Sequence, residues 1–318
     1  MHTSIHHEHL GDGISLIDIG LERPHFAACY LIESNGAAVI FDAGTNHSVP
    51  RVLDAIAARG LKPTDVRHVI PSHVHLDHAG GTGALLRELP NADVLAHPRG
   101  VRHLLDPSAL QASAEGVYGV DVVACTYGEL VPVPPTRIRA LADGEVIDLN
   151  GRALHFMDSP GHARHHVTMY DKASASWFTG DCFGISYRDF DGGDAPFIFP
   201  TTSPIQFEPD AMKATIARML ERAPRAMFLT HYSRIEQPAE RAQALVRLLD
   251  AQVGLARAAF ERNDAVAALT DELLRLYFAE VRRLGSTVTE ADSRELLAID
   301  AELNAKGMLT WLERGAKG

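Results

Sequence analysis

The stretch at residues 70–83 constrains the fold of this chain more than any other part of the sequence. It reads Ile-Pro-Ser-His-Val-His-Leu-Asp-His-Ala-Gly-Gly-Thr-Gly, and three imidazoles and one carboxylate fall within the six positions 73–78. The preceding residues 66–70 are rich in β-branched side chains, as expected of a buried strand. The strand is therefore expected to end where the metal-competent side chains begin.

This loop has the residue types and the spacing of a metal site. Side chains two residues apart in an extended chain share a face, so His73 and His75 are expected to point to one side. The glycines that follow allow the chain to turn, so Asp77 and His78 can approach a second point nearby. One short loop can thus offer two pairs of ligands to two adjacent metal ions.

The stretch resembles the His-x-His-x-Asp-His signature of the metallo-β-lactamase superfamily. Three later stretches are similar to the remaining motifs of that family, and each follows an apolar run that predicts a strand. These are the Pro-Gly-His turn ending at His162, the Thr-Gly-Asp turn ending at Asp181, and the strand at residues 226–230 that precedes His231. The motifs occur in the family's order over about 160 residues.

The resemblance implies an α/β fold, the αββα sandwich of that family, and a dinuclear metal centre. In the family pattern, one ion is bound by His73, His75 and His162. The other ion is bound by Asp77, His78 and His231, and Asp181 bridges the two. Zn²⁺ is the expected metal, with Fe and Mn²⁺ as alternatives, because imidazole and carboxylate ligands accept all three. Asp77 and Asp181 are the expected catalytic residues, in a hydrolysis by metal-bound hydroxide.

Two further residues resemble supporting positions of the family. Asp42 begins an Asp-x-Gly turn that would support residues 70–83, here called the metal loop, from behind. A simple strand-to-helix turn is an equally good interpretation. His166 matches the second histidine of the Gly-His-Thr-x-Gly-His stretch in glyoxalase II-like members. The present chain departs from that stretch, since Ala163 replaces Thr and His165 replaces Gly. We expect His165 at the surface, with a position facing the pocket as the alternative, and its role cannot be assigned from the sequence.

Composition excludes several classes of function. The chain has 318 residues with a formal net charge of −11, so it has no basic surplus for binding nucleic acid. The three cysteines lack metal-binding or disulfide spacing, which indicates a reducing compartment. No signal-like apolar segment or membrane-length apolar run is visible. A cytoplasmic protein with a small-molecule substrate and no membrane is expected, and homodimer formation stays open.

Two Asn-Gly pairs predict β-hairpins in the first half of the chain. Asn35-Gly36 lies between apolar runs at residues 27–32 and 37–42, and Asn150-Gly151 lies between runs at 145–149 and 152–157. Residues 49–59 form an amphipathic pattern that predicts a helix before the strand at 66–70. Residues 106–142 combine a helical pattern with a Pro-rich run, and their structure and role cannot be assigned from the sequence.

An aromatic stretch follows Asp181 and is expected to form a wall of the substrate pocket. Its large side chains are those of Phe183, Tyr187, Phe190, Phe197 and Phe199. The character of the sequence then changes near residue 236. We expect a catalytic domain at residues 1–235 and a C-terminal helical extension at 236–318, packed near the active site.

Three apolar stripes of helical period support the helical extension. The third stripe contains Leu296, Ile299, Leu303 and Leu312. Because no predicted ligand lies after His231, removal of the residues after 237 is expected to leave the metal content largely intact and to weaken substrate selection.

The resemblance narrows to the glyoxalase II-like branch of the superfamily, which contains thioesterases, esterases and lactonases. The expected activity is hydrolysis of a thioester, ester or lactone. A phosphodiesterase built on the same site is one alternative, because the same centre can attack phosphorus. A regulatory or binding protein that retains the metals is the other.

Overall fold

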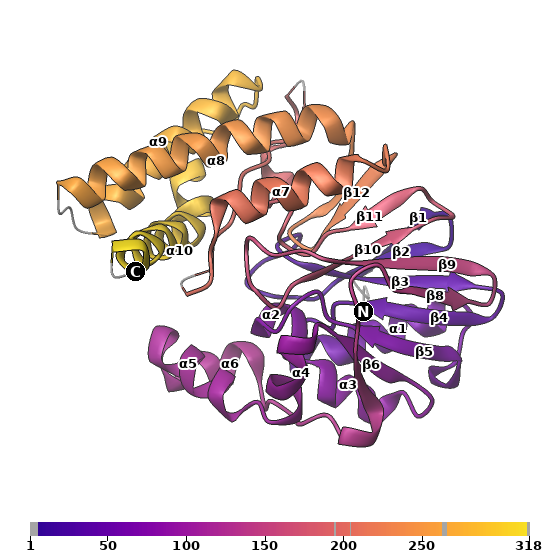
Figure 1. The fold of residues 1–318 in the computed structure, drawn as a ribbon. Coiled ribbons are helices and arrows are strands. Elements are labelled where there is room, and N and C mark those ends of the chain that lie inside the picture. The colour runs from indigo at the N-terminus through magenta and orange to yellow at the C-terminus, as the bar shows by residue number, and fades with distance from the viewer. Residues whose placement is uncertain (1–5, 194, 204, 263–265, 317–318) are drawn as a thin grey trace, which may run out of the picture. The chain divides into compact units, whose positions relative to one another are not determined.

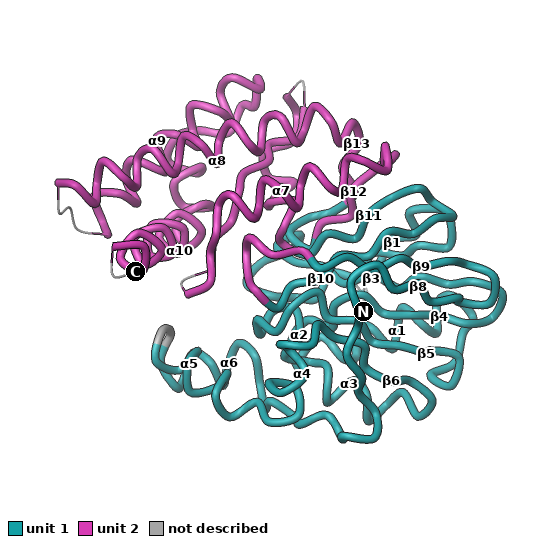
Figure 2. Tube along the Cα trace, viewed as in Figure 1, with its two compact units in different colours: residues 1–158, 165–180, 230–233 teal, residues 159–164, 181–229, 234–318 magenta. Residues whose placement is uncertain are grey.

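The computed structural model describes residues 6–193, 195–203, 205–262 and 266–316. The chain divides into two compact units (Figure 2). Unit 1 comprises residues 1–158, 165–180 and 230–233, and unit 2 comprises residues 159–164, 181–229 and 234–318. The chain therefore passes between the units several times.

Unit 1 contains a seven-stranded mixed sheet (Figure 1). In spatial order its strands are β1 (His7–Gly11), β2 (Ile14–Asp18), β3 (Ala28–Ser34), β4 (Ala37–Phe41), β5 (Val66–Ile70), β6 (Asp93–Ala96) and β7 (Ile138–Ala140). Neighbours from β1 to β4 are antiparallel, and neighbours from β4 to β7 are parallel. The carboxyl ends of β4 and β5 consequently lie at the same edge, where the metal loop begins.

A second set of strands in unit 1 packs against this sheet. It consists of β8 (Val146–Leu149), β9 (Arg152–Asp158), β10 (Val167–Asp171) and β11 (Ser176–Phe178), all antiparallel to their neighbours. The ring of Phe178 contacts Tyr30 and Phe41 at centroid distances of 5.2 and 5.6 Å. Both Asn-Gly hairpins form as predicted, and their turns bond to each other through Asn35 and Asn150.

Helices cover the other face of the seven-stranded sheet. The helices of unit 1 are α1 (Val49–Ala58), α2 (Leu76–Ala79), α3 (Thr82–Glu88), α4 (Pro98–Leu105), α5 (Ser108–Tyr118) and α6 (Val120–Tyr127). Val52, Ala55 and Ile56 lie on one face of α1 and are buried in the same apolar cluster as Ile40 of β4. The predicted helix at residues 49–59 is thus confirmed to within one residue.

Unit 2 is mainly helical (Figures 1 and 2). Its elements are α7 (Pro209–Leu220), β12 (Ala226–Leu229), most of β13 (Ser233–Glu236), α8 (Pro238–Glu261), α9 (Val266–Arg283) and α10 (Glu290–Ala316). Short 3₁₀ turns at Asn46–Ser48, Pro63–Asp65, Pro135–Arg137 and Arg188–Phe190 complete the described secondary structure of the two units. No helix among these described residues combines the length and apolar character needed to cross a membrane.

The buried face of α10 differs from the predicted apolar stripe. Ile299, which belongs to that stripe, is 51% exposed. The residues that α10 buries are Ser293, Leu297, Asp300, Ala301, Asn304, Ala305, Gly307 and Met308. The prediction was wrong because Asp300 and Asn304 find hydrogen-bonding partners inside unit 2, which makes burial of a partly polar face favourable.

The compact units do not coincide with the two contiguous domains predicted from the sequence. Residues 159–164 and 181–229, which precede the predicted boundary at residue 235, are grouped with the C-terminal helices. The predicted boundary separates a catalytic domain from a helical extension. The division into compact units does not test that assignment, so the boundary stays a prediction.

A buried ion pair ties the two sets of strands in unit 1 together. Arg152 donates to both carboxylate oxygens of Asp171 at 2.9 and 2.5 Å, and to the backbone oxygens of Asp12 and Glu33 at 2.7 and 2.9 Å. Burial alone would raise the pKa of Asp171, but the hydrogen bonds from Arg152 and Ser174 outweigh it and lower the pKa. The carboxylate therefore stays ionised inside the unit.

Replacing Arg152 with alanine should strongly destabilise the fold, because it leaves the Asp171 charge buried without its partner. We expect a loss of about 3–5 kcal/mol in the free energy of unfolding, measured by urea denaturation. Arg139→Ala is the matched control, since the ion pair of Arg139 with Glu145 is half exposed and should contribute less than about 1 kcal/mol.

The same pair predicts a pH dependence. The folded-state pKa of Asp171 lies below its unfolded value of about 3.9, so its contribution to stability is present above that pH and is lost as the pH falls through the folded-state pKa. Equal loss of stability on acidification in the wild type and in Asp171→Asn would contradict this account.

Candidate metal centre

The metal loop begins at the edge where β4 and β5 end. The backbone N–H of Ser72 donates to Asp42 Oδ1 at 2.7 Å, which fixes the first residue of the loop. Ser72 Oγ lies 3.0 Å from His73 Nδ1, and His73 Nε2 lies 2.7 Å from His75 Nδ1. The two imidazoles therefore converge on one point, as predicted from their spacing.

Asp77 and His78 lie on the short helix α2, which starts directly after His75. His78 is fully buried, and its Nδ1 lies 2.9 Å from Asp42 Oδ2. Its other ring nitrogen, Nε2, lies 3.4 Å from Asp77 Oδ2. Because Nδ1 faces the carboxylate of Asp42, which only accepts, Nδ1 carries a proton, and Nε2 is the nitrogen that can bind a metal.

His231 belongs to the segment of unit 1 at residues 230–233. Its Nδ1 lies 3.0 Å from the carbonyl oxygen of Phe26, and its Nε2 lies 3.1 Å from Asp77 Oδ2. One ligand atom from each of Asp77, His78 and His231 falls within 4.8 Å of the others. Two imidazole nitrogens and one carboxylate oxygen are a suitable donor set for a divalent metal such as Zn²⁺.

The electrostatics of this cluster keep Asp77 in the form that binds metal. Burial tends to raise the pKa of Asp77, but the adjacent imidazoles of His78 and His231, when protonated at Nε2, outweigh it and hold the pKa well below its usual range. The carboxylate is ionised, and its side chain remains about one quarter exposed. The cluster thus has a charged candidate ligand that solvent can reach.

Asp42 joins the parts of this cluster from behind. Its buried carboxylate accepts hydrogen bonds from the backbone N–H of Ser72 and from the hydroxyl of Thr230 at 2.6 Å, and it contacts His78 Nδ1. Ser72 and Thr230 each precede a predicted ligand directly, and sequence reasoning assigned no role to either. A hydroxyl residue immediately before a ligand histidine is the signal that could have indicated them.

The two remaining predicted ligands, His162 and Asp181, belong to unit 2. Both are buried, and His162 Nε2 lies 3.4 Å from Asp181 Oδ2. His162 Nδ1 lies 3.4 Å from the carbonyl oxygen of Thr201. Within unit 2, the pair again combines an imidazole Nε2 with a carboxylate. That these residues bind the same ions as the ligands of unit 1 stays a prediction.

His165 and His166 lie beside the metal loop within unit 1. The ring of His166 is fully buried and stacks on His73 at a centroid distance of 4.9 Å. A Cβ atom at Gly180 would lie 2.5 Å from His166 Nε2, so this position requires glycine. His165 was expected at the surface, but that expectation was wrong. It is 6% exposed, and its ring lies 5.7 Å from that of His75, because the close packing around the loop encloses it.

The aromatic residues predicted to line the substrate pocket are all buried in unit 2. They are Phe183, Tyr187, Phe190, Phe197 and Phe199. Phe197 stacks on Phe199 at 5.2 Å, and Phe199 also contacts Tyr277 of α9 at 5.0 Å. These contacts connect the segment after Asp181 to the C-terminal helices. Contact of the five side chains with a substrate stays a prediction.

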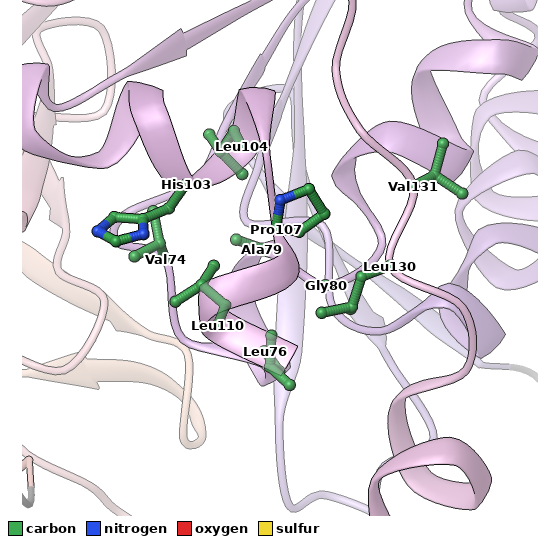
Figure 3. A pocket seen from close by; sticks show the side chains of 10 residues that line it. All are labelled: Val74, Leu76, Ala79, Gly80, His103, Leu104, Pro107, Leu110, Leu130 and Val131. Atoms are coloured by element: carbon green, nitrogen blue, oxygen red, sulfur yellow. The ribbon is translucent and has the colours of Figure 1, made fainter. Parts of the chain in front are cut away.

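An apolar pocket lies against the other side of α2 (Figure 3). Leu76 and Ala79 of α2 and the adjoining Gly80 line it, together with Leu104 and Leu110. Positions 76, 79 and 80 share one helix face, which leaves Asp77 and His78 on the other. Residues 106–142, whose structure could not be assigned from the sequence, thus form α5, α6 and β7 and help to hold α2 in place.

A family model described as the metallo-beta-lactamase superfamily matches residues 23–232, which is more than half of the chain. The chain belongs to this superfamily. The match includes every stretch on which the resemblance depends, from Asp42 to His231. The predicted superfamily membership is confirmed.

Two solved structures of the superfamily are similar to this chain. Protein ST1585 from Sulfolobus tokodaii is 25% identical, with a TM-score of 0.60 over 74% of this chain and 86% of that one. Protein TTHA1429 from Thermus thermophilus is 19% identical, with a TM-score of 0.67 over 97% of this chain and 95% of that one. The predicted αββα sandwich of the metallo-β-lactamase fold, with its C-terminal helical extension, is confirmed.

Two curated relatives are named as a thioesterase and a hydrolase. Acyl-coenzyme A thioesterase MBLAC2 of Homo sapiens is 30% identical over 55% of this chain and 65% of its own length. Hydroxyacylglutathione hydrolase of Stenotrophomonas maltophilia is 28% identical over 48% of this chain and 43% of its own length. The chain thus spans less than two thirds of the length of either superfamily relative.

Replacing Asp42 with asparagine should weaken metal binding. Asparagine has about the same size, but its amide NH₂ cannot accept from Thr230 and His78 as the carboxylate does. We expect the affinity for Zn²⁺ to fall about tenfold to hundredfold, measured by competition with a chelator.

Asp18→Asn provides the control for this substitution. Asp18 is also a largely buried carboxylate, and it accepts from the backbone N–H groups of Gly20 and His25, away from the ligands. If both substitutions lowered the affinity for Zn²⁺ equally, the effect of Asp42→Asn would come from a general loss of stability and not from the metal site.

Proposed function

We propose that this chain is a dinuclear metal-dependent hydrolase that cleaves thioesters. The observation that carries the proposal is the convergence of His78 Nε2 and His231 Nε2 on Asp77 Oδ2, at 3.4 and 3.1 Å. The distal nitrogens of both rings bond to protein groups, so the ligand atoms are oriented before any metal arrives. Such preorganisation is typical of a metal site and has no evident purpose in a structural salt link.

The ligand assignment that we propose follows the family pattern. His73, His75 and His162 would bind one ion, and Asp77, His78 and His231 the other. Asp181 would bind both, since a carboxylate has two oxygens that can each face one ion. Zn²⁺ is the proposed metal, with Fe and Mn²⁺ as alternatives. When bound, the ions would supply a nucleophile from water at neutral pH and would polarise the carbonyl group of the substrate.

Asp77, Asp42 and the backbone carbonyl of Phe26 have distinct roles in the proposed metal site. Asp77 carries a negative charge in the cluster, and it lowers the electrostatic cost of bringing a divalent cation there. Asp42 and the carbonyl of Phe26 accept from the distal ring nitrogens, so Nε2 is the nitrogen of His78 and of His231 that would give up its proton to bind a metal. The partial exposure of Asp77 leaves a way in for a small substrate.

The choice of a thioester rests on the relatives. MBLAC2 is named as an acyl-coenzyme A thioesterase, and the relative from Stenotrophomonas maltophilia as a hydroxyacylglutathione hydrolase. Shared identity of 28–30% with two such enzymes favours a thioester over the ester and lactone that the family pattern also admits. We further propose a cytoplasmic protein, because its three free cysteines fit a reducing compartment. We propose a small-molecule substrate because the acidic chain is poorly suited to nucleic acid.

Substrate screening and elemental analysis together test the proposal. The purified protein should contain about two divalent ions per chain, because seven ligands overfill one site. It should hydrolyse acyl-coenzyme A or hydroxyacyl-glutathione thioesters faster than a lactone or a phosphodiester. Preference for the phosphodiester would support that alternative activity, and metal content without any turnover would support a binding protein.

Asp181→Ala should lose both turnover and bound metal, because the proposed bridge holds both ions. We expect the metal content to fall below two ions per chain and thioester hydrolysis to fall by at least about a hundredfold. Asp191→Ala serves as the control, since Asp191 forms a surface ion pair with Arg188. Unchanged metal content and turnover in Asp181→Ala would rule out the proposed ligand set.

A further inference from the structure

The carbonyl oxygen of Thr201 orients His162. It lies 3.4 Å from His162 Nδ1, while His162 Nε2 faces Asp181. A carbonyl oxygen only accepts, so Nδ1 must carry the proton, and Nε2 keeps its lone pair. Rotation of the Thr201 carbonyl would remove this restraint, which makes the conformation of residues 200–202 important for His162.

The side-chain amide of Asn304, in α10, fixes the conformation of this segment. Asn304 Oδ1 accepts from the backbone N–H of Thr202 at 2.7 Å, and Asn304 Nδ2 donates to the carbonyl oxygen of Pro200 at 3.0 Å. The N–H of Thr202 and the carbonyl of Thr201 belong to one planar peptide group. One hydrogen-bonded chain therefore runs from Asn304 through this peptide group to His162.

The orientation of the Asn304 amide is not ambiguous. Its oxygen faces a backbone N–H, and its nitrogen faces a backbone carbonyl, so exchange of the two would break both bonds. Asn304 Nδ2 also donates to the hydroxyl of Tyr277 at 2.8 Å, which in turn accepts from Gln252 Nε2 at 2.7 Å. Burial raises the pKa of the Tyr277 phenol, so it remains protonated. The hydroxyl of Tyr277 in α9 thus links Gln252 of α8 to Asn304 of α10.

The backbone of α10 also approaches the same segment closely. A Cβ atom at Gly307 would lie 2.2 Å from Thr202 Oγ1 and 2.8 Å from the carbonyl oxygen of Ser203. Asn304 is only 1% exposed, and His162 is 3% exposed. The hydrogen bonds are therefore shielded from water, where each is worth more than at the surface.

We propose that Asn304 is a positioning residue for the metal ligand His162, acting through the Thr201–Thr202 peptide group. The inference rests on the proposed function, because it takes His162 as a ligand. Removal of α10 would then weaken the binding of one ion, contrary to the sequence-based expectation that metal content survives loss of the C-terminal helices. The extension becomes part of the support of the metal centre.

Asn304→Ala tests this inference in the full-length protein. We expect the affinity for one of the two Zn²⁺ ions to fall about tenfold to hundredfold, while the other ion binds as in the wild type. Competition with a chelator measures both affinities. The absorption spectrum of the Co²⁺-substituted protein should change as well, because it reports ligand geometry and not overall stability.

Asp300→Ala is the matched control. Asp300 lies one turn earlier on the buried face of α10, and its carboxylate accepts from the hydroxyl of Tyr187 at 3.1 Å, which lies outside residues 200–202. We expect this variant to lower the thermal stability without changing either affinity or the Co²⁺ spectrum. Equal effects of the two variants on metal binding would overturn the inference.

Two more variants complete the test. Tyr277→Phe removes one partner of Asn304 with little change in volume. It should lower the affinity for the same ion to a smaller extent. This variant keeps the test available if Asn304→Ala does not fold. His162→Ala should lose that ion outright. If His162→Ala kept both ions, the ligand assignment itself would fail. If it lost one ion but neither Asn304→Ala nor Tyr277→Phe weakened that ion, only the role of Asn304 would fail.

Discussion

The arrangement of the candidate metal centre in unit 1 depends on the buried carboxylate of Asp42. A carboxylate without exposure is costly unless its oxygens are hydrogen-bonded, and here three groups bond to it. They are the N–H of Ser72, the hydroxyl of Thr230 and Nδ1 of His78. These groups come from parts of the chain up to 188 residues apart from Asp42. One charge thus fixes the start of the metal loop, one ligand ring and the residue before another ligand.

The imidazoles of the candidate centre follow a common rule within each unit. His73, His78, His162 and His231 all direct Nδ1 at a protein oxygen, which leaves Nε2 for the cluster. His75 is the exception, since its Nδ1 faces Nε2 of His73. The oxygens that contact Nδ1 come from a serine hydroxyl, a carboxylate and two backbone carbonyls. Each ring is therefore restrained by a different local structure. At His78, His162 and His231 the oxygen only accepts, so Nδ1 carries a proton there.

The C-terminal helices have a structural role that superfamily membership alone would not indicate. The side chain of Asn304 bonds to the backbone of residues 200–202, and the ring of Tyr277 packs on Phe197 and Phe199. These polar groups are hydrogen-bonded at buried positions, where an unmade bond would be costly, and this fixes one conformation of the segment. The helices thereby stabilise the chain between Asp181 and α7, whether or not they also contact a substrate.

The sequence by itself determined the local structure around the metal loop and the family of the chain. Strand 66–70, helix α1 and both Asn-Gly hairpins follow from periodicity and turn chemistry, which act between neighbours in the chain. The spacing of His73, His75, Asp77 and His78 likewise identified the candidate ligands. Tertiary structure alone decided that His165 is buried and that α10 buries Asp300 and Asn304 in place of Ile299. Burial of a polar side chain depends on partners more than a hundred residues away, such as Tyr187 and Thr202, and no local pattern records them.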